Sequence, residues 1–160
     1  MTSTLSVPRP LRHNGGMELK LPDLAATIAF ASRIAAIMQP GDAILLEGPL
    51  GAGKTEFARA VLRAATRTPA LEVPSPTFTL VQSYDTPSGT VHHFDLWRLT
   101  GPDGLAELGW DDARDDIVLV EWPDRLAHLV PDRSLTIRLD PGIGESRIAH
   151  VDGWPDRLSP

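Results

Sequence analysis

A glycine-rich segment that ends in a lysine and a threonine could bind the phosphates of a nucleotide. Residues 48–55 read GPLGAGKT and match the pattern GxxxxGK[ST]. In such a loop the glycines let backbone N–H groups point at phosphate oxygens, and a following helix adds the positive end of its dipole. Lys54 would bring its charge to the outer phosphates, and Thr55 would offer its hydroxyl to Mg²⁺. The alternative is a glycine-rich turn that carries a lysine by accident.

Two carboxylates could complete this site. A bound Mg-nucleotide needs a carboxylate for the metal or its waters, and a group that orients the attacking water. Glu121 follows the apolar run 117–120, and Asp95 follows a predicted strand at 90–94. Glu121 should project at the carboxyl edge of the sheet, where the phosphate loop also lies, and Asp95 ends the second arm of a predicted hairpin. Alternatively, Asp95 caps the following turn and Glu121 is a surface carboxylate.

Two missing motifs favour adenine over guanine as the base. Guanine-specific GTPases read the base with an Asn-Lys-x-Asp motif, but the only asparagine is Asn14, and no Asp-x-x-Gly segment occurs. We therefore expect ATP as the substrate and Mg²⁺ as its cofactor. Trp122 follows Glu121 directly and could reach the nucleotide. The predicted nucleotide-binding residues are Leu50, Gly51, Ala52, Gly53, Lys54, Thr55, Glu56 and Trp122.

The other titratable clusters are weaker candidates for a site. His92 and His93 are adjacent, so on a strand they would face opposite sides and could not chelate one metal together. Four aspartates lie between residues 111 and 116. They could hold a cation, but a solvated turn with capping carboxylates suits them better. No arginine is identifiable as an arginine finger.

The elements around the loop stand in the order that a phosphate-binding site requires. A helical pattern runs from Asp23, a candidate N-cap, to Pro40-Gly41. Its predicted apolar face comprises Leu24, Ile28, Ala31, Ala35 and Met38. The apolar run 43–46 suits a strand buried on both faces of a parallel sheet. After the loop, helical spacing continues to Thr68-Pro69.

The second half of the chain predicts more strands than helices. Residues 77–84 and 90–94 alternate and flank a turn at 86–89, which indicates an antiparallel hairpin. Residues 117–120 predict a second buried parallel strand, and 123–129 a short helix with a proline in its first turn. Residues 101–108 and 110–115 predict short helical or irregular segments. Residues 135–139 and 148–151 predict a final hairpin at an edge of the sheet, giving an α/β fold.

Length and composition fit one globular domain. The chain has 160 residues, 42% of them hydrophobic, and no apolar run approaches the roughly 20 residues that span a bilayer. We therefore expect no membrane span. A formal net charge of −6 argues against direct binding of DNA or RNA. The absence of cysteine excludes disulfides and thiolate metal sites. It fits a reducing compartment, so we expect a cytoplasmic protein.

The two ends of the chain predict tails. Residues 1–16 contain two arginines, two prolines and a closing Gly-Gly but no acidic residue. A targeting peptide is an alternative, but the segment lacks the apolar region of a secretory signal, and a flexible tail fits its composition better. We therefore expect a flexible N-terminal tail at 1–16, one domain at 17–153 and a C-terminal tail at 154–160.

Several segments together resemble a known family. GPLGAGKTEFAR, SPTFTLVQSYD, HHFDLWRL, ELGWDD and VEWPDRL, in this order and spacing, resemble the bacterial TsaE family, the ATPase of tRNA threonylcarbamoyladenosine biosynthesis. The resemblance covers residues 19–150. It implies a P-loop NTPase three-layer sandwich with a mixed, mainly parallel central sheet and an antiparallel hairpin. It departs from many relatives at Trp97, where tyrosine is common, and at Glu56, where threonine is common.

The same resemblance implies roles and partners. Lys54 and Thr55 match the phosphate and Mg²⁺ residues, and Thr77 matches a switch-like threonine. Asp95 and Glu121 match carboxylates tied to metal binding and hydrolysis. The partners would be ATP and ADP and the TsaB–TsaD complex, with tRNA reached only through that complex, whose state ATP hydrolysis would reset between turnovers.

Two other functions remain open from the sequence. A small-molecule kinase shares the loop but needs an acceptor pocket and usually an arginine-bearing lid, and no long lid segment stands out between residues 68 and 116. A nucleotide-gated binding module would use Thr77 and the hairpin to change contacts with a partner, with turnover incidental.

Overall fold

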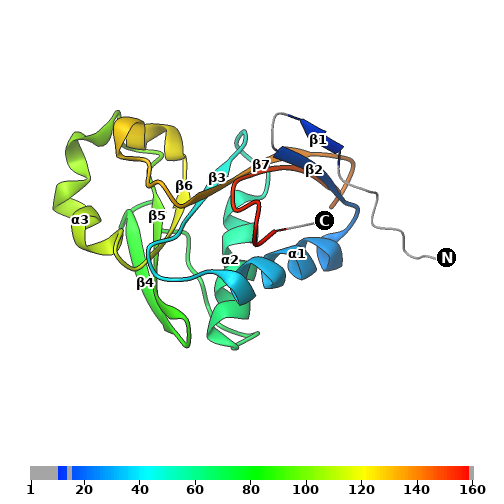
Figure 1. Ribbon diagram of the computed structural model, residues 1–160, viewed down its shortest axis with the longest axis horizontal. Helices are drawn as coiled ribbons and strands as arrows, with labels where there is room; N and C mark the ends of the chain where they lie inside the picture. The colour runs from blue at the N-terminus through cyan, green and yellow to red at the C-terminus, as the bar shows by residue number, and fades with distance from the viewer. Residues whose placement is uncertain (1–10, 14–15, 159–160) are drawn as a thin grey trace.

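One mixed β-sheet forms the centre of the molecule. The computed structural model describes residues 11–13 and 16–158. The sheet has eight strands in the order β1-β2-β8-β7-β3-β6-β5-β4. The strands are β1 (Leu11–His13), β2 (Gly16–Leu21), β3 (Ala43–Glu47), β4 (Val81–Thr86), β5 (Gly89–Asp95), β6 (Ile117–Glu121), β7 (Ser134–Pro141) and β8 (Arg147–Asp152). Figure 1 shows the sheet running across the molecule with both edges visible.

Parallel pairing is confined to the centre of the sheet. The neighbours β7–β3, β3–β6 and β6–β5 are parallel, whereas β4 on one side and β8, β2 and β1 on the other are antiparallel to their neighbours. All five residues of β6 and the first four of β3 are buried, as expected for parallel strands covered on both faces. The predicted α/β class, with a mixed sheet and an antiparallel hairpin, is confirmed.

The antiparallel side of the sheet is larger than the sequence analysis indicated. The prediction that β8 lies at an edge is wrong, because β8 pairs with both β7 and β2. Strand β2 was not predicted, although it alternates: Met17, Leu19 and Leu21 are buried while Glu18 and Lys20 are more exposed. This short alternating segment was missed because it adjoins residues 1–16, which were predicted to be a flexible tail.

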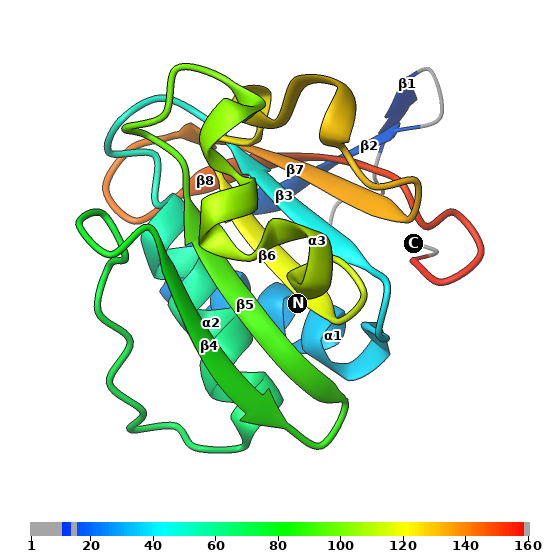
Figure 2. The same cartoon turned by 90° about the vertical axis from the view of Figure 1, so that its left-hand side faces the viewer.

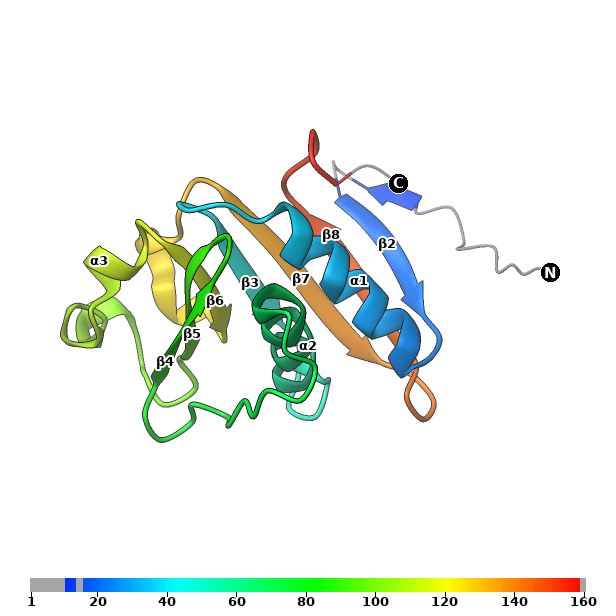
Figure 3. The same cartoon turned by 90° about the horizontal axis from the view of Figure 1, so that it is seen from below.

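Helices cover the two faces unequally. Helices α1 (Leu24–Ile37) and α2 (Lys54–Thr66) pack on one face, as Figures 1 and 3 show. The other face carries α3 (Trp110–Ala113) and the 3₁₀ segments η1 (Pro102–Gly104), η2 (Ala106–Leu108) and η3 (Pro123–Leu129), which lie in front of the sheet in Figure 2. A separate apolar cluster fills each interface, so the three layers of the predicted sandwich are present.

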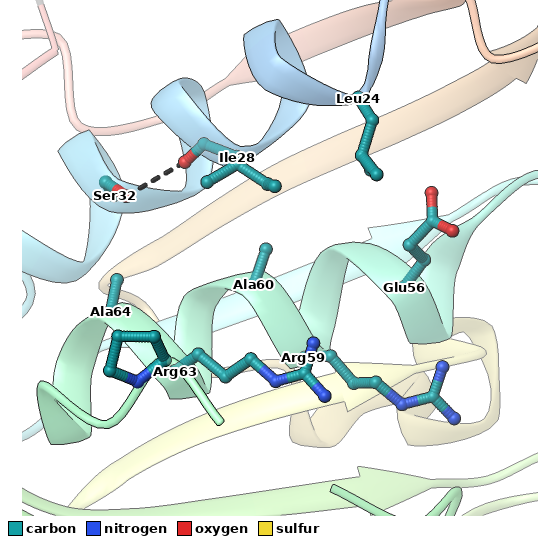
Figure 4. Close-up of a pocket in the computed structure, with 9 residues that line it drawn as sticks. Leu24, Ile28, Ser32, Glu56, Arg59, Ala60, Arg63 and Ala64 are labelled. Atoms are coloured by element: carbon teal, nitrogen blue, oxygen red, sulfur yellow. Dashed lines mark hydrogen bonds between the residues drawn. The ribbon is translucent and has the colours of Figure 1, made fainter. Parts of the chain in front are cut away.

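Helix α1 begins where the sequence predicts, and three residues of its predicted apolar face, Ala31, Ala35 and Met38, are buried. Asp23 caps it, with its side chain accepting a hydrogen bond from the N–H of Ala26 at 2.8 Å. The buried residues are Thr27, Phe30, Ala31, Ile34 and Ala35. The predicted core position Ile28 is 46% exposed. With Leu24 it borders a groove of about 520 Å³ toward Ala60 of α2 (Figure 4). The inward stripe is therefore centred about one residue away from the predicted one.

The chain ends differ from the predicted tails. Residues 11–13 of the predicted N-terminal tail form β1, which pairs with β2, while residues 1–10 and 14–15 lie outside the described ranges. In the predicted C-terminal tail, Trp154 and Leu158 are buried in the α1-side core. Arg157 donates to both carboxylate oxygens of the buried Asp42, at 2.8 and 2.9 Å. Trp154 and Leu158, which are four residues apart, therefore anchor an otherwise polar C-terminal segment.

Within the described part of the chain, every helix is too short or too polar to cross a lipid bilayer.

Candidate nucleotide-binding site

The loop between β3 and α2 has the backbone shape that the glycines predict. Gly48 and Gly53 have φ values of 141° and 97°, in the region that L side chains rarely adopt. A Cβ on Gly48 would lie 2.5 Å from the carbonyl oxygen of Leu139 on β7. A Cβ on Gly53 would lie 2.9 Å from Nε of Arg147 on β8. The loop is thus packed against neighbouring strands, and glycine is required at both positions.

Lys54 is held inside this loop. Its side chain is buried, and its ammonium Nζ donates to the carbonyl oxygens of Gly48 at 2.6 Å and Pro49 at 2.9 Å. The same nitrogen lies 4.1 Å from the centre of the Trp122 ring. Burial lowers the pKa of Lys54 below its usual value, and the negative charges of Glu121 and Asp95 oppose that shift. Loss of hydration is therefore the larger effect on the Lys54 amine, and the two carboxylates offset it only in part.

Asp95 and Glu121 lie side by side at the carboxyl ends of β5 and β6. They are register partners on these parallel strands, and both are almost completely buried. Thr55 Oγ1 donates to Glu121 Oε1 at 2.8 Å. Thr77 Oγ1 donates to Asp95 Oδ2 at 3.2 Å. The structure thus brings both carboxylates into contact with hydroxyls from two other segments.

The turn-capping alternative for Asp95 is also partly realised. The N–H of Trp97 donates to Asp95 Oδ1 at 3.0 Å. One oxygen of this carboxylate therefore organises the following turn, while the other contacts Thr77. Capping and a role in the site are compatible, because each uses a different oxygen. Glu121, in contrast, is 2% exposed, which excludes the surface-carboxylate reading.

These residues share one cavity of about 460 Å³, a size common for small-molecule sites. The residues that line it are Leu50, Gly51, Gly53, Lys54, Thr55, Glu56, Ser75, Thr77, Asp95, Trp97, Glu121, Trp122 and Arg147. Every predicted site residue is among them except Ala52. The side chain of Ala52 is buried in the core, and its N–H donates to the Pro49 carbonyl at 3.1 Å.

Three of the lining residues were missed by the sequence analysis. Ser75 Oγ lies 2.7 Å from Thr77 Oγ1 and donates to it, since Thr77 in turn donates to Asp95. The Trp97 ring lies 4.5 Å from that of Trp122. Arg147 Nε donates to the Ala52 carbonyl at 2.8 Å and so braces the phosphate loop from β8. Ser75 lies two residues before Thr77, and Trp97 lies two residues after Asp95, so their proximity to predicted site residues could have identified them. No feature of the sequence around Arg147 predicts that it reaches the site.

The two adjacent histidines diverge, as predicted. His92 contacts Asp116 and Ser83, whereas His93 contacts Glu121. Across the described ranges, no cluster of three or more histidine, cysteine, aspartate or glutamate side chains is arranged to hold a metal.

The protein has the P-loop NTPase fold. A buried parallel strand, β3, leads into a glycine-rich loop, and the lysine and threonine of that loop begin helix α2. Two carboxylates lie next to each other at the ends of the parallel strands β5 and β6. The sequence profile described as "Threonylcarbamoyl adenosine biosynthesis protein TsaE" matches residues 21–149. The chain belongs to the TsaE family.

Individual relatives agree with this assignment. The tRNA threonylcarbamoyladenosine biosynthesis protein TsaE of Rickettsia bellii is 35% identical over 125 residues, which cover 76% of this chain and 85% of that protein. The protein of the same name from Mycobacterium bovis is 34% identical over 152 residues, 86% of this chain and 83% of that one. The crystal structure of Bacillus subtilis YdiB superimposes with a TM-score of 0.67 and 25% identity, covering 89% of this chain and 88% of YdiB.

Proposed function

We propose that this chain binds ATP with Mg²⁺ and hydrolyses it to ADP and phosphate, in the cytoplasm, as the ATPase of tRNA threonylcarbamoyladenosine biosynthesis. One observation carries the proposal: the hydroxyl of Thr55, at the start of α2, donates to the carboxylate of Glu121 at the end of β6. This hydrogen bond connects the phosphate loop to Glu121, the carboxylate that would hold the metal or orient the attacking water, and both residues line the same cavity. The names of the relatives supply the biosynthetic context.

The residues present fit an Mg-nucleotide. The N–H groups of Gly51 and of residues 53–55, together with the Lys54 ammonium, would bind the β- and γ-phosphates. The hydroxyl of Thr55 and the carboxylates of Asp95 and Glu121 are hard oxygen donors of the kind that Mg²⁺ prefers, and the phosphates would supply further oxygens. When bound, the metal would neutralise charge that develops on the transferred phosphoryl group.

The side chains would divide the work of hydrolysis. Lys54 would exchange a loop carbonyl for a phosphate oxygen and stabilise the negative charge that develops on the transferred phosphoryl group. Of the two carboxylates, one would hold the metal or its waters, and the other would orient the attacking water. Trp122 would pack against the nucleotide while its ring contacts Lys54.

Protein partners would complete the reaction cycle. We extend the proposal to the TsaB–TsaD complex as the partner, with tRNA contacted only through it. Phosphate release that rises when purified TsaB and TsaD are added supports this step. An unchanged rate and separate elution of the proteins would count against it.

A nucleotide-gated binding module is the second candidate, and one feature favours it. Thr77, hydrogen-bonded to Asp95, directly precedes Phe78, whose side chain is 82% exposed. If nucleotide binding changed the hydrogen bond between Asp95 and Thr77, the position of the exposed Phe78 side chain would change with it, because Phe78 is the next residue in the chain. Partner binding that differs between ATP and ADP but survives loss of turnover in a Glu121→Ala variant would favour the module over the ATPase.

The decisive test is a lysine substitution with an internal control. The chain has only two lysines, Lys20 and Lys54. Lys54→Ala should weaken Mg-ATP binding in calorimetry and lower phosphate release about 100-fold or more, because a charge that stabilises the transition state is lost. Lys20→Ala, on the exposed side of β2, should leave both unchanged. Equal activity of the two variants would refute the site. Transfer of phosphate to a small-molecule acceptor, with little free phosphate, would indicate a kinase instead.

A further inference from the structure

A buried histidine lies directly behind the proposed catalytic carboxylate. His93 precedes Asp95 by two residues on β5, so both side chains point to the α2 face of the sheet. Its register partner on β6 is Leu119, two residues before Glu121. His93 Nε2 lies 2.7 Å from Glu121 Oε2, and the histidine side chain is completely buried. The function proposed above leaves this residue without a role.

We propose that His93 is a positioning residue of the nucleotide site, which fixes the carboxylate of Glu121 for its work on the metal or the attacking water. This inference rests on the proposed ATPase function. His93 does not line the cavity, so it acts through Glu121 and does not contact the nucleotide.

The hydrogen bonds define the orientation of the carboxylate. An ionised carboxylate only accepts, so His93 carries its proton on Nε2 and donates it to Glu121 Oε2. Thr55 Oγ1 donates to the other oxygen, Oε1. Both oxygens are held from different sides, one from β5 and one from α2. Rotation of the carboxylate would therefore break at least one of two charge-assisted hydrogen bonds.

The second ring nitrogen shows that packing alone does not explain a histidine here. His93 Nδ1 is buried and has no hydrogen-bond partner among the residues that the structure describes. A buried acceptor without a partner costs stability, whereas an apolar side chain of similar size would avoid that cost. What an apolar residue could not supply is the N–H donated to Glu121. Residues that break a packing rule in this way are expected beside functional sites.

The neighbouring histidine provides the contrast. His92 points to the opposite face of the sheet, where its Nε2 lies 2.9 Å from Asp116 Oδ2 and its Nδ1 lies 2.7 Å from Ser83 Oγ. Both of its nitrogens have partners, and neither partner lines the nucleotide cavity. His92 is therefore a matched control: the same residue type, one position away, also paired with a carboxylate.

The test compares leucine and glutamine at both histidines. His93→Leu removes the donor, whereas His93→Gln keeps an N–H that can reach the carboxylate. We expect His93→Leu to lower kcat about 10- to 100-fold, the usual effect of losing a group that orients a metal-site ligand. The gain in ATP affinity that Mg²⁺ confers, measured by calorimetry without turnover, should fall as well. His93→Gln should restore most of both, and His92→Leu and His92→Gln should change neither.

A purely structural role predicts a different order. Leucine would then match or exceed glutamine, and the affinity gain from Mg²⁺ would not distinguish them; either result would overturn the inference. If wild type itself bound no Mg-ATP, the proposed function would fail first, which keeps the two failures distinct.

Nitrogen-15 NMR of the wild-type protein covers the case in which His93→Leu does not fold. We expect His93 to be the tautomer protonated on Nε2, and its ring resonances to shift on addition of Mg-ATP more than those of His92. A proton on Nδ1, or resonances of His93 that ignore Mg-ATP, would contradict the assignment.

Discussion

Replacing Thr55 with valine should damage stability and catalysis together, because one hydroxyl serves both. The hydroxyl donates to Glu121 Oε1 at 2.8 Å, and Glu121 is 2% exposed. Hydrogen bonds to charged groups contribute about 1.5–3 kcal/mol to folding, and a buried oxygen left unpaired costs a similar amount. Since valine keeps the shape of threonine, we expect a loss of about 1.5–3 kcal/mol, or about 3–12 °C in Tm for a chain of this size.

Thr66 on the same helix supplies the control. Its hydroxyl donates to the carbonyl of Leu62 at 2.8 Å, a neutral acceptor within the helix. Thr66→Val should therefore cost about 1 kcal/mol or less and leave turnover unchanged. Thr55→Ser, which keeps the hydroxyl, should recover most of the stability and of the phosphate release. Urea or thermal unfolding and a phosphate-release assay measure both quantities.

A double-mutant cycle isolates the contact itself. Thr55→Val and Glu121→Leu should be coupled by about 1 kcal/mol or more, because the first removes the donor and the second removes the acceptor of the same hydrogen bond. If Thr55→Val were as stable as Thr66→Val and still released phosphate at the wild-type rate, the Thr55 hydroxyl would have neither role. Additive effects in the cycle would show that the hydroxyl and the carboxylate act independently.

Two further predictions concern arginines outside the loop. Arg147→Ala removes the hydrogen bond to the Ala52 carbonyl and should weaken Mg-ATP binding several-fold in calorimetry, whereas Arg138→Ala, an exposed arginine on β7, should not; equal affinities would contradict the bracing role. Arg157→Ala leaves the fully buried Asp42 with fewer partners and should destabilise the protein by about 1–3 kcal/mol in urea unfolding, with ATP affinity unchanged. A stability within 0.5 kcal/mol of wild type, roughly the scatter of surface substitutions, would show that the C-terminal segment is not anchored there.

Most of the helices and strands could be predicted from short, contiguous stretches of the sequence. The phosphate loop is written in consecutive residues, and the strand before it and the helix after it have clear apolar patterns. Glu121 was placed by the general rule that the carboxyl ends of parallel strands meet at one edge of the sheet, whereas Asp95 was proposed as the end of a hairpin arm and supported by the family resemblance. The structure shows that the same rule also covers Asp95, because Asp95 and Glu121 are the last residues of two neighbouring parallel strands.

Contacts between distant segments could not be read from the sequence. The hydrogen bond between His93 and Glu121 joins residues 28 positions apart, and that between Arg147 and Ala52 joins residues 95 positions apart. Both depend on strand order, which no local pattern specifies. The prediction that Ile28 belongs to the inward face of α1 was wrong for a related reason. Ile28 fits the helical period as well as its buried neighbours do, and only packing against the sheet selects between the two stripes.

The most direct test of the account is a crystal structure with Mg²⁺ and a non-hydrolysable ATP analogue. We predict that phosphate oxygens lie within hydrogen-bonding distance of Lys54 Nζ and of the N–H groups of Gly51 and residues 53–55. The metal should lie beside Thr55 Oγ1 and at least one of Asp95 and Glu121. A nucleotide bound elsewhere on the molecule, or a metal that contacts none of these oxygens directly or through water, would contradict it.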